Sequence, residues 1–245
     1  MIVLVQETVC CELNRDYKGA NEMSIETINP ATGALLHCYD TMTSKEVDRL
    51  LHVADAQFQQ WRRLPLSERC QHMASLGEQL AAHERALATL MTQEMGKPIQ
   101  QSLAEIKKCR SLCDYQVEHI ATWLMPSYVE TEFEYSAVHY EPIGVLLAIM
   151  PWNFPFWQVF RFAVSQILAG NVVVLKHAPN VTGCAIKIAN LFREAGFPEG
   201  VFTTLVIETD PVAAIINDQR VQGVALTGSA SAGKIVGSQA GAALK

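Results

Sequence analysis

The chain has 245 residues, of which 49% are hydrophobic and 18% are charged, and its net charge is −6. That composition provides ample apolar side chains for a buried core and argues against intrinsic disorder. A mildly acidic chain without a Lys/Arg block does not favour nucleic acid as a partner, and no apolar run reaches the roughly 18 residues that a membrane span needs. We therefore expect a globular protein that binds neither nucleic acid nor membrane.

Residues 1–23 have an irregular pattern and are predicted to be an N-terminal extension. The pattern does not decide whether Met1 or Met23 is the natural start. Residues 24–245 are predicted to form one domain, which opens with a Pro/Gly turn at 29–33. Capping signals and apolar spacing then predict three helices: one from the capping box Thr43-x-x-Glu46 to Trp61, a longer one capped by Ser67 and ending near Met95, and a third over 99–124.

Residues 128–141 change to an alternating pattern, with Glu130, Glu132 and Glu134 between apolar and aromatic side chains. This alternation predicts one or two extended strands with a polar side. Such a ribbon buries little surface by itself. It is suited to docking on another sheet, for example in a partner subunit.

After Pro142, apolar runs alternate with amphipathic stretches. Runs that are apolar on both faces and separated by crossover helices predict an α/β fold, with a parallel sheet covered by helices on both faces. Ligands bind such sheets at the carboxyl ends of the strands. The predicted strands cover 145–150, 171–176, 201–207 and 221–227, and the predicted helices cover 155–169, 181–195 and 210–217, with a last helix after a small-residue loop at 228–233.

Two of these strand ends carry polar side chains. Asn153 follows the first strand between two prolines, where its amide either donates to a developing oxyanion or caps the next helix. The local pattern does not separate these two interpretations. Lys176 ends the second strand, and a lysine there suits an anion or the hydroxyls of a ribose. From the local pattern alone, a solvated lysine without a ligand is the commoner case at a strand end. His177 beside Lys176 is expected to be an ordinary polar loop residue.

The fourth strand leads into small residues from Gly228 to Gly233. Small side chains at a helix N-terminus let backbone N–H groups approach a phosphate. With Lys234, the segment also matches most of a P-loop, although Ile235 stands where a P-loop needs Ser or Thr. We therefore favour a dinucleotide phosphate site over an NTPase.

Cysteine and histidine chemistry gives weaker signals. The seven cysteines are odd in number and form no CxxC pair, which is typical of reduced thiols in the cytoplasm. Cys109 and Cys113 lie four apart on a predicted helix without companion ligands, so we expect no metal site. The N-terminus also lacks the basic start and long apolar stretch of a secretory signal, which again predicts a cytoplasmic protein.

Taken together, the motifs resemble the N-terminal half of the NAD(P)-dependent aldehyde dehydrogenase family, from about Ile25 to Lys245. The variant at 176–181 and the ending at 239–245 most resemble the bacterial succinate-semialdehyde dehydrogenase branch. The resemblance rests on motifs in the family's order: Asn29-Pro30-Ala31-Thr32-Gly33, Glu94-Met95-Gly96-Lys97-Pro98, Glu141-Pro142-Ile143-Gly144, Pro151-Trp152-Asn153-Phe154-Pro155, Ala169-Gly170-Asn171 with Leu175-Lys176, and Leu226-Thr227-Gly228-Ser229.

The resemblance implies a Rossmann-like cofactor-binding domain for NAD or NADP, with 128–141 as oligomerisation strands. It implies that Asn153 stabilises the oxyanion of a thiohemiacetal and that Lys176 contacts the adenosine ribose. It further implies that a turn lies beside the pyrophosphate and that the end of the first strand lines the cofactor cleft. The residues concerned are Gly228 and Ser229 for the turn, and Ile149, Met150, Pro151 and Trp152 for the cleft.

Two departures qualify this resemblance. The sequence stops at Lys245, before the family's Leu-Glu-Leu-Gly-Gly motif with its general-base Glu and before the catalytic Cys. Because a thiolate must attack the aldehyde before hydride leaves, we expect a truncated dehydrogenase without the catalytic domain, inactive alone. Pro179 stands where NAD-preferring relatives often carry a Glu, so the choice between NAD and NADP stays open.

Three functional hypotheses follow for the chain. The first is the truncated dehydrogenase, whose full-length relatives would oxidise succinate semialdehyde or a similar small aldehyde, and which would form a homo-oligomer or associate with a full-length homologue. The second is a non-catalytic module that binds a dinucleotide or pairs with an intact homologue through 128–141. The third is a split enzyme whose catalytic domain is supplied by a separate chain.

Overall fold

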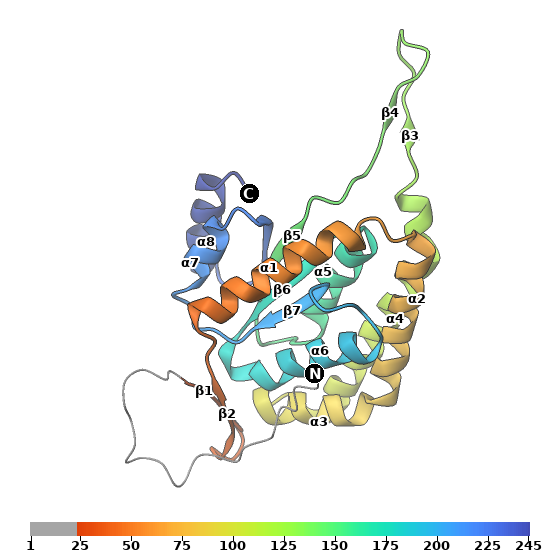
Figure 1. The fold of residues 1–245 in the computed structure, drawn as a ribbon. Helices are drawn as coiled ribbons and strands as arrows, with labels where there is room; N and C mark the ends of the chain where they lie inside the picture. The colour runs from red at the N-terminus through yellow and green to blue at the C-terminus, as the bar shows by residue number, and fades with distance from the viewer. Residues whose placement is uncertain (1–23) are drawn as a thin grey trace.

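The computed structural model describes residues 24–245, and a four-stranded parallel sheet lies at its centre (Figure 1). The strand order is β7-β6-β5-β8, and Ile149 of β5 pairs with Lys176 on one side and with Leu226 on the other. The four strands are β5 (Val145–Met150), β6 (Val172–His177), β7 (Phe202–Leu205) and β8 (Val221–Leu226). The predicted parallel sheet is therefore confirmed.

Helices cover both faces of this sheet, as the sequence predicts. Because strand–helix–strand connections are right-handed, α5 and α6 share one face, and α7, which returns across the sheet, lies on the other beside α1. The helices that follow the strands are α5 (Trp157–Leu168), α6 (Thr182–Glu194), α7 (Val212–Asn217) and α8 (Ala230–Ala242), and a short 3-10 turn covers Pro179–Val181.

Among residues 24–245, four further helices precede the sheet: α1 (Ser44–Trp61), α2 (Leu66–Ala82), α3 (Glu84–Met95) and α4 (Ile99–Trp123). The predicted capping box of α1 is confirmed. The Thr43 N–H donates to Glu46 Oε2 at 2.7 Å, and the Glu46 N–H donates to Thr43 Oγ1 at 3.3 Å. At the other end of α1, the Trp61 indole donates to the Ile167 carbonyl at 2.9 Å, which ties α1 to the end of α5.

The single long helix predicted from Ser67 to Met95 is wrong. The helix begins at Leu66, and it breaks at His83, which adopts φ −104° and ψ 7°. Neither Pro nor Gly marks this break. The chain turns there because α3 packs toward α6, where the Glu94 carboxylate accepts from the Gly183 N–H at 2.8 Å. The apolar spacing continues through the break, so the sequence pattern does not reveal it.

In the described part of the chain, two small antiparallel ribbons lie outside the central sheet. β1 (Ser24–Ile28) pairs with β2 (Leu35–Asp40) around the predicted turn, where Gly33 has φ +72°. The sequence analysis predicts only that turn and misses the strands, which bury one face alone through Ile25 and Thr27.

The second ribbon projects from the body of the molecule (Figure 1). Its strands, β3 (Ser127–Tyr128) and β4 (Ala137–Val138), contain two residues each, so regular pairing is shorter than predicted over 128–141. The residues between the two strands have no packing surface to hold them flat, as the 70% exposure of Phe133 and the 61% exposure of Tyr135 show. Within the described range, no helix is both long and apolar enough to cross a membrane.

Candidate functional site

The carboxyl ends of β6, β5 and β8 lie side by side, and they bring together the three segments that the sequence singles out. The Thr227 N–H donates to the Ile149 carbonyl at 3.1 Å, and the Ala178 N–H donates to the Met150 carbonyl at 3.0 Å. These bonds tie the segment that leads to Gly228 and the segment that follows Lys176 to the end of β5. The Asn153 loop begins at that same end.

The loop after β5 presents its side chains outward. Trp152 is 51% exposed, Phe154 is 46% exposed, and Asn153 between them is also exposed. Phe156 is the N-cap residue of α5, and its side chain makes no capping hydrogen bond. The Asn153 side chain forms no hydrogen bond with any described residue, so its interpretation as a helix cap is wrong. The amide is therefore available to a ligand.

A carboxylate from a distant helix caps α5 instead. Glu105 of α4 is 4% exposed, and its Oε1 accepts from the Phe156 N–H at 3.0 Å and from the Trp157 N–H at 2.9 Å. Its Oε2 forms a buried ion pair with Lys97. The Lys97 ammonium also lies 3.9 Å from the centre of the Phe154 ring. Sequence reasoning misses both residues, because nothing in the local pattern links them to a loop some 50 positions later.

His177 supports the same loop from the strand side. Its Nε2 lies 2.9 Å from the Pro155 carbonyl, and its Nδ1 accepts from the Ala178 N–H at 2.8 Å. This pair of contacts fixes the neutral tautomer with the proton on Nε2. Burial lowers the pKa of His177 to about 4. The expectation of an ordinary polar loop residue is therefore wrong, since the ring is buried and structural.

Lys176 is buried at the end of β6, with 6% of its surface exposed. Burial lowers the pKa of its ammonium, and the charge of Glu208 partly offsets that shift. The ammonium makes no ion pair and no hydrogen bond with the described residues. A buried cation with unused donors suits an oxygen-rich ligand.

The segment after β8 differs from the predicted loop. Helix α8 begins at Ala230, and the Ser229 hydroxyl caps it by accepting from the Ala232 N–H at 3.2 Å. Lys234 therefore lies inside the helix, so the P-loop interpretation is wrong.

Gly228 leaves open space at this turn. A Cβ built on it would meet its nearest neighbour, Leu226 Cδ1, at an ordinary 3.4 Å, and its φ is not positive. The protein's own packing does not require a glycine there. A bare backbone at a helix N-terminus does fit the close approach of a pyrophosphate, so the residues present fit a dinucleotide.

A cavity of about 370 Å³ lies between the ends of β5 and β8 and the adjoining helix α5. The Arg161 guanidinium of α5 lines it and donates to Thr227 Oγ1 at 3.2 Å. Arg161 is the only charged side chain among the lining residues, and it is exposed. The sequence analysis does not single it out, because one arginine on a helix carries no local signal.

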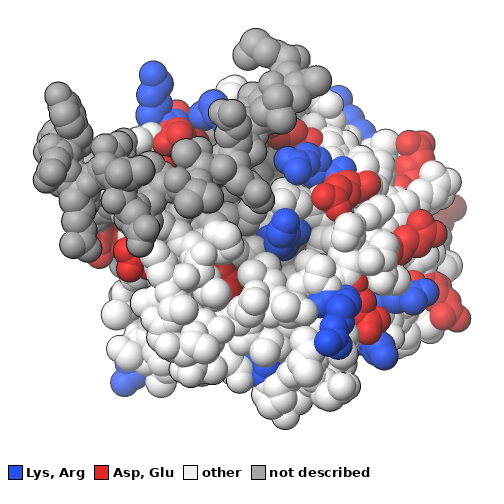
Figure 2. All heavy atoms as spheres, turned by 90° about the horizontal axis from the view of Figure 1, so that it is seen from below, with Lys and Arg blue, Asp and Glu red and all other residues white. Residues whose placement is uncertain are grey.

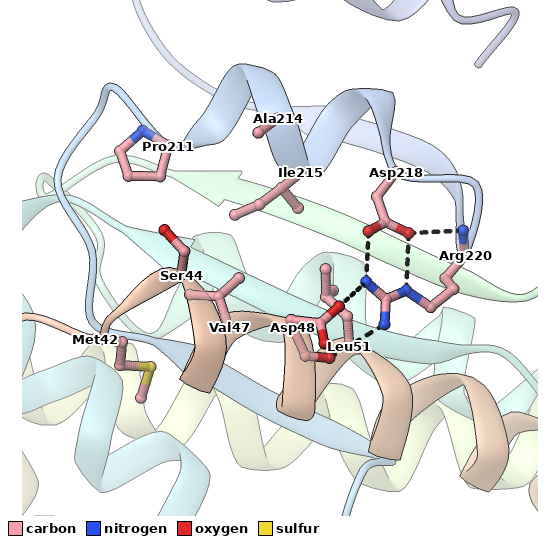
Figure 3. A pocket seen from close by; sticks show the side chains of 10 residues that line it. All are labelled: Met42, Ser44, Val47, Asp48, Leu51, Pro211, Ala214, Ile215, Asp218 and Arg220. Carbon is pink, nitrogen blue, oxygen red and sulfur yellow. Dashed lines mark hydrogen bonds and ion pairs between the residues drawn. The ribbon is translucent and has the colours of Figure 1, made fainter.

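A second hollow, of about 150 Å³, lies between α1 and α7 (Figure 3). Its walls are mostly apolar, and Arg220 closes one end by donating to Asp218 Oδ2 at 2.6 Å and to Asp48 Oδ1 at 2.7 Å. The hydrogen bond with Arg220 lowers the pKa of Asp218. Because the only cation that lines it is fully paired, this hollow offers no charge to a ligand. Its ion pairs join α1 to the turn before β8.

Surface charge and thiol chemistry add no further site. Figure 2 shows acidic and basic side chains interspersed on the face seen from below, outside the grey atoms. In residues 24–245, no group of three His, Cys, Asp or Glu side chains could hold a metal ion. The same range holds five free cysteines, and burial raises the pKa of Cys109, Cys113 and Cys184. Those three thiols stay protonated and unreactive.

Comparisons with known proteins agree on one family. Residues 17–245 match the model of the aldehyde dehydrogenase family. Succinate semialdehyde dehydrogenase Sad of Escherichia coli, which uses NAD(P)+, is 44% identical over 219 residues, which cover 89% of this chain and 47% of that protein. A probable NADP(+)-dependent succinate-semialdehyde dehydrogenase of Synechocystis is 44% identical over 223 residues, covering 91% and 49%.

The solved structures show the same partial coverage. Succinic semialdehyde dehydrogenase from Streptococcus pyogenes, in complex with NADP+, superposes with a TM-score of 0.88 at 34% identity. The match covers 90% of this chain and 49% of that one. The chain thus spans about half the length of the relatives that it matches.

Proposed function

Because this chain belongs to the aldehyde dehydrogenase family, we propose that it supplies the dinucleotide-binding half of an enzyme that oxidises succinate semialdehyde or a similar short aldehyde to the acid. Membership confirms the resemblance that the motifs carry, and the similar relatives are succinate-semialdehyde dehydrogenases. The chain spans about half the length of those relatives. The aldehyde oxidation that a whole enzyme carries out is therefore proposed for this chain only as a contribution to that reaction.

The observation that carries the proposal is the meeting of three segments at the carboxyl edge of neighbouring strands. Lys176 would hold the adenosine ribose, and the backbone at Gly228 and Ser229 would adjoin the pyrophosphate. The walls of the cleft would be Ile149, Met150, Pro151 and Trp152. When bound, the nicotinamide accepts a hydride from the substrate. The Asn153 amide would donate to the substrate oxygen as that oxygen gains negative charge.

Two features support the choice of cofactor and substrate. Pro179 provides no carboxylate that would repel a 2′-phosphate, and NADP+ is the cofactor of the Synechocystis and Streptococcus relatives. We therefore propose that NADP+ binds at least as tightly as NAD+.

The choice of substrate is supported by a charge. Arg161 places a cation beside the cavity at the end of β5, where the carboxylate of succinate semialdehyde would find a partner.

Three of the five described cysteines are buried and support the further proposal that this chain alone does not turn over aldehyde. The Cys184 N–H, at the start of α6, donates to Glu94 Oε2 at 2.9 Å. Burial raises the pKa of the Cys184 thiol well above the usual value. Cys109 and Cys113 are buried within α4. None of these is a thiolate that could attack a carbonyl.

Titration and turnover test the two parts of the proposal separately. Calorimetric titration of the purified chain with NADP+ and NAD+ is expected to show binding, and Lys176→Ala is expected to weaken it at least about tenfold, as loss of charged hydrogen bonds implies. No binding of either dinucleotide would refute the proposed role. A steady-state assay with succinate semialdehyde is expected to show no reduced cofactor. Turnover that Asn153→Ala abolishes would refute inactivity.

The projecting ribbon favours a second candidate, a non-catalytic module that pairs with an intact homologue. Tyr128, Phe133 and Tyr135 are all more than half exposed on it. Exposed aromatic side chains of this kind are enriched at protein interfaces. Co-purification with a full-length relative, lost when Phe133 and Tyr135 are replaced by Ser, would favour this candidate. If no full-length relative co-purifies, the result would favour the dehydrogenase half as a monomer or as a homodimer.

A further inference from the structure

Buried polar side chains hold the Asn153 loop from beneath. Lys97 is 6% exposed and Glu105 is 4% exposed, and they form an ion pair under the first turn of α5. Glu105 binds the Phe156 and Trp157 N–H groups, and the Lys97 ammonium contacts the Phe154 ring. The pair therefore links the fixed end of the loop to its exposed middle.

The helix cap alone does not require this lysine. Glu94 caps α6 in the same way, because its two oxygens accept from the Gly183 N–H at 2.8 Å and the Cys184 N–H at 2.9 Å. No ammonium pairs with Glu94 among the described residues. A buried ion pair loses hydration on both partners and seldom stabilises a fold better than an apolar pair of the same size. Lys97 therefore needs another explanation than capping.

The exposed half of the loop has few other restraints among the described residues. Asn153 makes no hydrogen bond with the described residues, and Trp152 beside it is half exposed. On the far side, His177 holds only the Pro155 carbonyl. A donor that serves an oxyanion must be held within roughly 0.5 Å of its productive position. Two interactions hold the residue next to Asn153: the Gln158 N–H donates to the Phe154 carbonyl at 3.0 Å, and the Lys97 ammonium contacts the Phe154 ring. The contact with Lys97 is the one that fixes the Phe154 side chain among the described residues.

We propose that Lys97 is a positioning residue, which holds the Phe154 ring and thereby aims the Asn153 amide, with Glu105 as its buried counter-ion. The inference rests on the proposed function of Asn153 as a donor to the substrate oxygen. It assigns Lys97 no contact with substrate or cofactor. The residue acts through the conformation of residues 152–154.

Hydrogen exchange of the loop tests this in the chain as it exists. Lys97→Met keeps an apolar stem and removes the ammonium. We expect exchange of the Gln158 amide, whose N–H donates to the Phe154 carbonyl, to become about tenfold faster, in keeping with a desolvated cation–π contact. Lys97→Arg, which keeps a cation over the ring, is expected to restore exchange to within about threefold of the original. Amides of β6 should not change in either variant.

Two matched controls separate positioning from general stability. Glu94→Gln weakens a cap of the same kind on α6 and should leave exchange at Gln158 unchanged. Phe154→Leu removes the ring and leaves the ion pair of Lys97 in place, and since Phe154 is 46% exposed the variant is expected to fold. It should accelerate exchange at Gln158 as Lys97→Met does.

The outcomes are distinguishable. Exchange at Gln158 within about twofold of the original in both Lys97→Met and Phe154→Leu would overturn the proposal. Equal acceleration by Glu94→Gln would also overturn it, because the effect would then be general. If the unaltered chain fails to bind NADP+, the proposed function fails, yet the exchange result on Lys97 still decides whether the loop is held as described.

Discussion

His177 is kept neutral by its surroundings. Its ring is buried between the end of β6 and the Pro155 carbonyl, and both ring nitrogens are engaged in hydrogen bonds. Burial lowers its pKa from the ordinary 6.5 to about 4. The folded protein therefore resists a proton that the unfolded chain accepts.

This difference predicts a pH dependence of stability. Above pH 6.5 the ring is neutral in both states, so its contribution to stability is fully present. As the pH falls toward 4, only the unfolded state gains the proton, and about 3 kcal/mol is lost at about 1.4 kcal/mol per pH unit. Urea unfolding at pH 7 and pH 4.5 measures the loss.

His177→Asn is the control for that prediction. It should lower stability at pH 7 and flatten the fall between pH 7 and pH 4.5. Glu94 titrates in the opposite sense, because burial raises its pKa and the folded state then takes up a proton more readily as pH falls. An equal fall in the original chain and in His177→Asn would show that other groups cause it.

Residue-level prediction works where a residue lies at the end of a predicted element. Asn153, Lys176 and Gly228 each follow a strand, so the strand pattern alone places them on one edge of the sheet. Lys97 and Glu105 act through contacts across the fold, and a helix pattern records only that Glu105 is polar. The sequence cannot show which buried carboxylate meets which N–H group.

At the scale of elements, strong periodic signals are reliable and breaks are not. The capping box at Thr43 and the apolar runs of β5 and β6 are visible because local chemistry alone produces them. The break at His83 has no Gly or Pro to mark it, since packing of α3 against α6 causes it. The hairpin of β1 and β2 is missed because too few of its residues are buried to give a pattern.

Helix α8 offers a direct test at this scale. Gly233, Gly237 and Gly241 lie on it, and a Cβ at each would meet nothing within 4 Å. Glycine lowers helix stability because the unfolded chain gains freedom. Gly237→Ala is therefore expected to stabilise the protein by about 0.5–1 kcal/mol in urea unfolding.

At Gly144, a substitution by Ala is expected to have the opposite effect on stability. Gly144 has φ +140°, and a Cβ there would lie 2.6 Å from Gln222 Cγ. Gly144→Ala should destabilise the protein by about 1–3 kcal/mol, since both the backbone and the neighbour must shift. Destabilisation by Gly237→Ala instead would mean that another surface packs on that side of α8.

For the whole molecule, the strand order leaves β8 at an edge. It pairs with β5 alone among the described strands, and α8 behind it buries only Ala240. Its partner Val145 lies far from Val221 in the chain, whereas β5, β6 and β7 follow one another directly. The β8–α8 unit therefore has less to hold it than the inner strands.

We expect the amides of β8 and α8 to exchange before those of β5 and β6 when native-state hydrogen exchange is followed over time. Bound NADP+ should slow exchange at Gly228 and Ser229, since the proposed phosphate site lies there. If β8 is protected as long as β6, the edge strand is covered by something outside the described fold.

The projecting ribbon affects how the particle moves in solution. An arm that extends from a rounded body adds drag without adding much mass (Figure 1). A single copy of this chain will then elute from a sizing column as if it were heavier, and the elution volume alone would suggest a pair. Light scattering or sedimentation equilibrium, which weigh the particle directly, are the measurements that count its copies.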